Sequence, residues 1–176
     1  MDKRFIVVSG LPGSGKSTLG GQVARALGLP MLDKDDILEA LFESKGTGDA
    51  RWRRVLSREA DVLLQAAAIA SKGAVLVSHW HLPGMAVESG TPVDWLTQLP
   101  GRIVHLHCVC PVEVAGARFV GRKRHPGHCD GARSDAEILA SIAEVSQMGH
   151  LDIGTRVDVD TSNAPDLSRL LQEVRS

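Results

Sequence analysis

Short apolar runs alternate with longer amphipathic segments along the whole chain. Five runs predict buried strands, at 5–9, 30–33, 74–78, 102–110 and 156–160. Apolar residues at helical spacing predict helices at 16–27, 37–42, 50–71 and 93–99, and further helices after 111, 134 and 163. Strands that are apolar on both faces are typical of a parallel sheet covered on both sides. The pattern therefore predicts a three-layer α/β fold.

The longest predicted helix, 50–71, carries two adjoining rows of apolar residues. We expect both rows to line its buried side, as Val55, Val62, Ala66 and Ile69, with Leu56, Leu63 and Ala70 beside them. A capping box of Ser134 and Glu137 marks the start of a later helix. The Pro- and Gly-rich segment 79–92 predicts a loop.

Length and composition favour one globular domain spanning 1–176. The chain has 176 residues, a net charge of −1 and three cysteines. Such a charge argues against a nucleic-acid partner unless a local basic patch supplies one. An odd, small number of cysteines favours a reducing compartment, and no apolar stretch approaches the length of a membrane span. We expect a cytoplasmic protein without a membrane partner, either a monomer or a homodimer.

A glycine-rich stretch follows the first predicted strand and opens a helix. It matches the phosphate-loop pattern G-x-x-x-x-G-K-[ST] without a gap. Glycines allow a tight loop whose amides point at an anion, and the helix N-terminus adds a favourable dipole. Lys16 would reach the β- and γ-phosphates, and Ser17 would place its hydroxyl on Mg²⁺. The expected phosphate-binding residues are Gly10, Leu11, Pro12, Gly13, Ser14, Gly15, Lys16, Ser17 and Thr18.

Two aspartates, Asp33 and Asp35, stand where the second strand gives way to a helix. They could simply cap that helix, since acidic residues are favoured there. Their position beside the phosphate loop also suits catalysis. One carboxylate could serve the metal and the other could accept a proton from an attacking hydroxyl.

A basic segment follows the fourth strand. It contains Arg118, Arg122, Lys123, Arg124 and Arg133. Arg118 and Arg122 are one helical turn apart and are expected to point the same way. The loop after them could close over a triphosphate, and its arginines would stabilise charge on the transferred group.

With these motifs in place, the chain resembles the small P-loop kinases of the nucleoside-monophosphate-kinase-like group, such as shikimate kinase, gluconate kinase and the kinase half of polynucleotide kinase. It is most similar to the AAA-domain set of small-molecule kinases, which also includes zeta-toxin-like and chloramphenicol-phosphotransferase-like proteins. The resemblance covers nearly the whole chain and is carried by "GLPGSGKST", "LDKDDI", "ARFVGRKRHPGH" and "VDTSNAPDL". It implies a P-loop NTPase fold with sheet order 2-3-1-4-5, a basic lid at about 123–133, and the use of ATP.

The resemblance also implies roles for single residues. Asp35 matches the carboxylate that contacts or deprotonates the acceptor hydroxyl, and Asp33 matches a position often linked to Mg²⁺. Arg118 would flank the adenine. Arg122 and Arg124 would face the phosphates from the lid.

The segment 161–164, including Thr161 and Asn163, would lie near the base by the same resemblance. Many relatives carry an aspartate at the end of the third strand, where this chain has Ser78, His79 and Trp80. Either Asp33 takes over the outer shell of the metal, or this strand faces the acceptor. We favour the second reading, with His79 and Trp80 shaping an acceptor pocket, although Trp80 could instead pack beneath the loop.

Other polar residues give weaker signals. Arg54 or Arg58, on the long helix, could hold an anionic acceptor, and a surface role is at least as compatible with the pattern. Two clusters resemble metal sites on paper, but strand alternation separates the histidines from the cysteines of 105–110, and 125–129 has no paired C-x-x-C.

The leading hypothesis is an ATP-dependent phosphotransferase acting on a hydroxyl of a small molecule, with Mg²⁺ as cofactor. Its expected catalytic residues are Lys16, Asp35, Arg122 and Arg124. One alternative is a nucleotide-binding regulator or ATPase without an acceptor, and another is a nucleic-acid 5′-hydroxyl kinase. The sequence does not name the acceptor.

Overall fold

A five-stranded parallel sheet organises residues 3–175, the part of the chain that the computed structural model describes. The strand order is β2-β3-β1-β4-β5. The strands are β1 (Arg4–Gly10), β2 (Met31–Asp33), β3 (Ala74–Val77), β4 (Arg102–Val109) and β5 (Thr155–Asp160). The predicted strand order and α/β fold are therefore confirmed.

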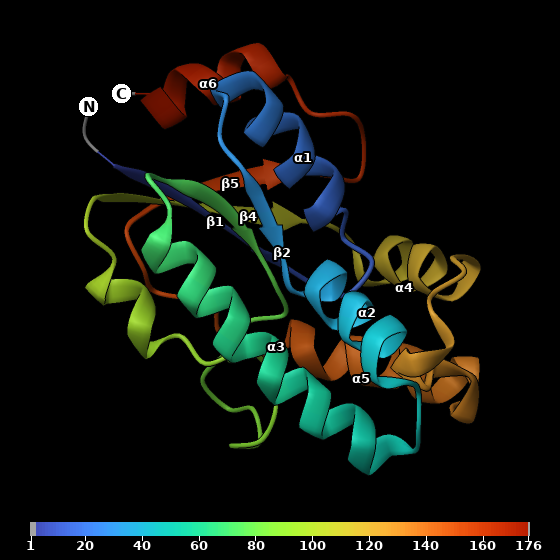
Figure 1. The fold of residues 1–176 in the computed structure, drawn as a ribbon. Helices are drawn as coiled ribbons and strands as arrows, with labels where there is room; N and C mark the ends of the chain where they lie inside the picture. The colour runs from blue at the N-terminus through green and yellow to red at the C-terminus, as the bar shows by residue number, and fades with distance from the viewer. Residues whose placement is uncertain (1–2, 176) are drawn as a thin grey trace.

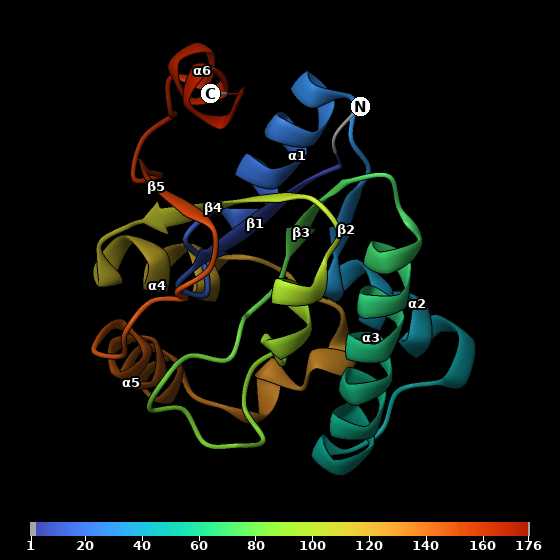
Figure 2. The same cartoon turned by 90° about the vertical axis from the view of Figure 1, so that its left-hand side faces the viewer.

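Helices cover both faces of this sheet (Figures 1 and 2). The helices α1 (Lys16–Leu27) and α6 (Leu167–Arg175) pack on one face. On the other face lie α3 (Ala50–Ala70) and a 3₁₀ turn, η1 (Asp94–Gln98). The helices α2 (Lys34–Lys45), α4 (Val112–Gly121) and α5 (Asp135–Ser146) gather near the carboxyl ends of the strands.

Alternation along β1 builds the core on both sides of the sheet. Ile6 and Val8 face α1 and α6, whereas Phe5 and Val7 face α3. All four side chains are fully buried. Burial of such a side chain stabilises a fold by about 1.5–3 kcal/mol, so the central strand holds both helical layers in place.

Most predicted elements are present, with differences at their ends. The capping box of Ser134 and Glu137 forms as expected at the start of α5. The segment expected to form a helix at 93–99 is a 3₁₀ turn, and the last helix begins at Leu167 rather than near 163. The lid segment contains two short 3₁₀ turns, η2 (Pro126–His128) and η3 (Asp130–Ala132).

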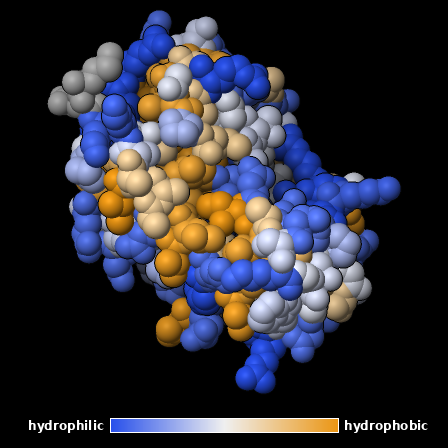
Figure 3. All heavy atoms as spheres, in the orientation of Figure 1, coloured by the Kyte–Doolittle hydropathy of each residue, from blue (hydrophilic) through white to orange (hydrophobic). Residues whose placement is uncertain are grey.

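The predicted buried side of α3 is wrong except at Leu56, which is buried as expected. The buried residues of this helix are Leu56, Ala60, Asp61, Leu64 and Ala68. The expected row is turned toward the surface, and Figure 3 shows apolar side chains gathered where α3 crosses the face toward the viewer. One reason is that the buried side includes Asp61, whose carboxylate pairs with Lys34 at 2.6 Å, and a pattern of apolar residues does not mark a charged residue as buried.

No helix in residues 3–175 is both long enough and apolar enough to cross a bilayer.

A buried imidazole, His105 on β4, gives a prediction about stability. Its side chain is fully buried and its Nε2 lies 2.6 Å from the Ser9 hydroxyl. Burial, followed by the charges of His107 and Arg156, lowers the pKa of His105 to about 4. In the unfolded chain this imidazole binds a proton as the pH falls below about 6.5, whereas in the folded chain it stays neutral down to about pH 4. The free energy of unfolding therefore falls as the pH falls between these two values.

We expect this one histidine to remove about 2 kcal/mol from the free energy of unfolding between pH 7 and pH 5. Urea denaturation at both values measures the loss, and His105→Gln should reduce it by that amount. The exposed His150 offers a matched control, as His150→Gln. Equal pH dependence in wild type and His105→Gln would contradict the assignment.

Candidate active site

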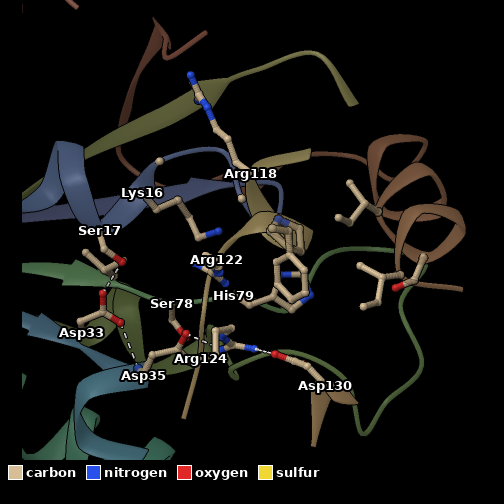
Figure 4. A pocket seen from close by; sticks show the side chains of 18 of the residues that line it. Lys16, Ser17, Asp33, Asp35, Ser78, His79, Arg118, Arg122, Arg124 and Asp130 are labelled. Carbon is tan, nitrogen blue, oxygen red and sulfur yellow. Dashed lines mark hydrogen bonds and ion pairs between the residues drawn. The ribbon is translucent and has the colours of Figure 1, made fainter. Parts of the chain in front are cut away.

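A cavity of about 430 Å³ opens at the carboxyl ends of the central strands. Ligands of open parallel α/β sheets bind at this edge. The phosphate loop, the start of α2, the end of β3 and the lid all contribute to its wall. We call it the first cavity; Figure 4 shows its main side chains.

The phosphate loop leads directly into α1. Gly15 is the N-cap, in a left-handed conformation (φ 91°), and no side chain caps the helix. The first amides of α1 are therefore left for an anion, and the helix dipole favours negative charge there. Gly13 also has a positive φ of 81°, and a Cβ there would lie 2.0 Å from the Ala115 carbonyl oxygen.

Lys16 points its ammonium group into the centre of the first cavity (Figure 4). Its Nζ donates hydrogen bonds to the carbonyl oxygens of Gly10 (3.0 Å) and Leu11 (2.9 Å). Burial lowers the pKa of Lys16. A phosphate beside this ammonium group would reverse that effect, because an anion favours the charged form.

Ser17 and Asp33 form a pair of oxygen ligands beside Lys16. The Ser17 hydroxyl donates to Asp33 Oδ2 at 2.6 Å, and Asp33 Oδ1 accepts the Asp35 amide at 2.9 Å. Burial raises the pKa of Asp33, outweighing these two bonds. A hydroxyl and a carboxylate are hard oxygen donors of the kind that Mg²⁺ prefers, so the pair fits this ion.

Asp35 belongs to a chain of charges that crosses the cavity mouth. Arg124 lies 2.8 Å from Asp35 through Nη2 and 2.8 Å from Asp130 through Nη1 (Figure 4). Burial alone would raise the pKa of Asp35, but Arg124, His128 and Arg122 outweigh it and lower that pKa. Asp35 is therefore an ionised carboxylate at neutral pH.

The lid segment is docked onto α2. His125 Nε2 lies 2.9 Å from Glu43 Oε1, and His128 Nε2 lies 2.9 Å from Glu39 Oε1. The Phe42 ring stacks on His125, with centroids 5.2 Å apart. These contacts hold Arg124 over the first cavity.

Arg118 and Arg122 both reach the cavity wall. They were predicted to point the same way, but their side chains point in different directions (Figure 4). Arg118 donates to the carbonyl oxygens of Thr161 (2.8 Å) and Ser162 (2.9 Å). Arg122 lies over the Phe119 ring, 4.6 Å from its centroid. The difference arises because α4 ends at Gly121, so helical spacing no longer governs Arg122.

The segment expected near the base lies next to Arg118. Thr161 is buried, and its hydroxyl donates to the Val109 carbonyl oxygen at 3.3 Å. Asn163 is exposed and donates to the Ser162 hydroxyl. Neither side chain belongs to the wall of the first cavity, whereas Arg118 does.

The two candidate acceptor residues that follow β3, His79 and Trp80, lie in different surroundings. His79 lies on the cavity wall, where burial, followed by the charges of Lys16 and Lys34, lowers its pKa to about 4. Trp80 packs in the core instead, with its indole N–H donated to the Val8 carbonyl oxygen at 2.8 Å. Trp80 is therefore not part of the wall of the first cavity, and its role in shaping an acceptor pocket stays a prediction.

The arginine of α3 that reaches the first cavity is Arg53, one position before the expected Arg54. Arg54 is exposed and is not part of the cavity wall, whereas Arg53 is part of it. Arg58 forms an ion pair with Asp61 at 3.2 Å. Arg53 lies three residues before the buried Leu56, so the correct helical phase of α3 would have identified it.

Residues from α5 also line the first cavity and were not expected from the sequence. They are Ile138, Ser141 and Ile142. Their spacing of three and four residues places them on one helix face. Nothing in a short apolar stripe distinguishes a cavity wall from an ordinary core contact, so only the structure could assign them.

Comparison with known proteins identifies the family and the fold of the chain. The model of the AAA domain family matches residues 5–142. The chain is 37% identical over 72 residues to a shikimate kinase of Corynebacterium glutamicum, covering 40% of this chain and 43% of that protein. Matches to two other shikimate kinases cover 16% and 30% of their length, so the similarity to these relatives spans less than half of each.

Two solved structures superpose over nearly the whole chain. A presumed kinase from Chloroflexus aurantiacus matches with a TM-score of 0.80 and 26% identity, covering 99% of this chain and 98% of the other. A shikimate kinase from Bacteroides thetaiotaomicron shares the fold at a TM-score of 0.56 and 18% identity, with 99% and 96% covered. The chain therefore belongs to the AAA domain family, and its fold is that of the small P-loop kinases.

Proposed function

We propose that the protein transfers the γ-phosphoryl group of ATP to a hydroxyl of a small molecule. One observation carries the proposal: the first cavity combines an uncapped helix N-terminus and Lys16 with an ionised carboxylate, Asp35. The first two suit a triphosphate. The carboxylate is what a transfer to a hydroxyl requires and simple nucleotide binding does not.

The proposed reaction is an in-line displacement. The acceptor oxygen bonds to the γ-phosphorus as the bond from phosphorus to the β–γ bridging oxygen breaks, and ADP leaves with that electron pair. Asp35 accepts the hydroxyl proton. Because the transition state of phosphoryl transfer is loose, orienting the hydroxyl matters more than strong basicity, and a carboxylate with a lowered pKa suffices.

The cations of the first cavity supply electrostatic stabilisation. Lys16 holds the β- and γ-phosphates, and Arg122 and Arg124 face the transferred group from the lid. Arg124 would exchange part of its contact with Asp35 for phosphate oxygens, which releases the carboxylate toward the acceptor. Arg118, beside 161–163, borders the adenine side.

Mg²⁺ fits the paired oxygens of Ser17 and Asp33. When bound there it would neutralise phosphate charge. Asp33 is otherwise a helix cap that keeps Asp35 in place through the Asp35 amide.

A coupled assay of ADP formation tests this function. The panel should contain charged polyols (shikimate and gluconate), neutral sugars (glucose and ribose) and uncharged aromatic alcohols (2-phenylethanol and tryptophol). We expect at least one acceptor to raise ADP formation well above the rate without acceptor, with phosphate incorporated into it. Acceptor-independent hydrolysis of equal rate across the panel would instead identify an ATPase.

Arg53 offers a test of the acceptor side of the cavity. Among the described residues its Nε has no hydrogen-bond partner, although the atom is buried. We propose that the guanidinium binds an oxygen of the acceptor. A hydrogen bond to a charged group contributes about 1.5–3 kcal/mol, so Arg53→Ala should lower kcat/KM for the acceptor about tenfold or more.

Arg54→Ala is the matched control, because the neighbouring side chain is exposed and lies off the cavity wall. It should change kcat/KM less than twofold. Steady-state kinetics with the best acceptor of the panel measures both variants. Equal losses from the two substitutions would remove Arg53 from the acceptor site.

A further inference from the structure

A second cavity, of about 310 Å³, lies beyond His79. Its wall comes from the carboxyl ends of β1 and β4, the segment after β3, the start of α4 and the end of α5. Proteins bind small molecules in cavities of this size. None of the roles proposed above uses it.

Three separate elements pass from the first cavity into the second. His79 borders both. In the phosphate loop, Pro12 lines the first cavity and the adjacent Leu11 lines the second. On α5, Ile142 lines the first and Val145, on the same helix face, lines the second. The two cavities are therefore neighbouring compartments, with His79 on the wall of both.

The two compartments differ sharply in charge. The first is bordered by six basic and three acidic side chains: Lys16, Arg53, Arg118, Arg122, Arg124, Arg133, Asp33, Asp35 and Asp130. The described residues that border the second include no Asp, Glu, Lys or Arg. Charged ligand groups are costly to bury without partners, so the second compartment selects against them.

Apolar side chains and imidazoles form the wall of the second compartment. Trp80, Leu82 and Val145 contribute apolar surface. His107 Nδ1 lies 2.8 Å from the Ser9 hydroxyl, which fixes the ring and leaves Nε2 for a ligand. Burial lowers the pKa of His107, and the pKa of His79 is about 4, so both rings are neutral at neutral pH.

We propose that the acceptor is an uncharged, largely apolar hydroxyl compound whose body occupies the second cavity, with its hydroxyl beside His79 and Asp35 in the first. This inference rests on the proposed function. At about 30 Å³ per water-sized group, the compartment holds on the order of ten non-hydrogen atoms. The neutral imidazole of His79 then stands at the junction, where its N–H can donate a hydrogen bond to the hydroxyl oxygen while Asp35 accepts the hydroxyl proton.

Filling the second compartment tests the proposal. Val145→Trp places a large ring at its wall, while Val62→Trp adds the same ring at an exposed position of α3. We expect 2-phenylethanol and tryptophol to be the preferred acceptors of the panel. Val145→Trp should raise their KM at least tenfold with the KM for ATP unchanged, and Val62→Trp should change neither.

Gly149→Phe is a second variant that guards against a folding defect. Gly149 borders the compartment, and a Cβ there meets no heavy atom within 4 Å, so a side chain can start at this position without a clash at its first atom. It should produce the same selective rise in KM. If shikimate or gluconate is the preferred acceptor and neither variant changes the KM for that acceptor, the proposal is overturned while the kinase function stands.

A binding measurement separates this inference from the proposed function. Tryptophol is titrated into the protein without nucleotide, and the imidazole signals of His107 and His150 are followed by NMR. We expect saturable shifts that disappear in Val145→Trp and persist in Val62→Trp. No saturable shift would overturn the proposal. Saturable shifts with no ADP formation from any acceptor would leave a neutral-ligand site and overturn the kinase function.

Discussion

Replacing Lys16 by methionine is expected to lower kcat/KM for phosphoryl transfer by a hundredfold to a thousandfold. Methionine keeps the length of the side chain but removes the ammonium group from the centre of the first cavity. Loss of one preorganised donor to developing charge costs about 10²–10³ in rate. Steady-state ADP formation with the best acceptor measures the effect.

The same substitution should leave the fold intact. Burial opposes the charge of Lys16, and its two hydrogen bonds go to carbonyl oxygens of its own loop. The free energy of unfolding of Lys16→Met should therefore equal or exceed that of the wild type. Activity within threefold of wild type would contradict the role of Lys16, and a large loss of stability would make the activity result uninformative about charge.

The second large effect is expected from Asp35→Asn. The amide keeps the shape of the side chain but cannot accept a proton, and general-base catalysis contributes about 10²–10⁴ in rate. We expect kcat to fall about a hundredfold while the KM for ATP changes little. Rapid-quench measurement of a single turnover checks that the chemical step is the one that slows.

Asp36→Asn is the control for this prediction. Asp36 is the next residue of α2, carries the same charge, is exposed and lies off the cavity wall. Its substitution should leave kcat within twofold of wild type. Comparable losses from both variants would mean that the rate depends on the net negative charge at the start of α2 and not on a proton acceptor at Asp35.

The fold was largely predictable because its signals are local. Continuous apolar strands, a gapless phosphate loop and a capping box are each readable within a few residues. The buried side of α3 was not, because that side contains two alanines and a paired aspartate, whereas several larger apolar residues of the helix lie outside it. Ala60, Asp61 and Ala68 are buried, while the larger Val62 lies 65% exposed. When a helix has apolar residues on two sides, its sequence alone does not show which side packs against the core.

The site was predictable where residues follow strand ends and unpredictable where it depends on packing between distant elements. Lys16, Ser17, Asp33 and Asp35 all come within a few residues of β1 or β2, and they meet in the first cavity. Their catalytic roles stay predictions. The contribution of α5 and of Arg53 depends on the phase of helices, so it required the structure.

The docking of the lid on α2 extends to a third element, α3. The Lys34 ammonium group lies 2.6 Å from Asp61 Oδ1, and this buried pair joins α2 to α3. With His125 and His128 fastening the lid to α2, the lid, α2 and α3 are linked in series. We therefore expect these three elements to respond together, so hydrogen exchange in 124–130 and in α2 should slow together when the nucleotide binds in the first cavity.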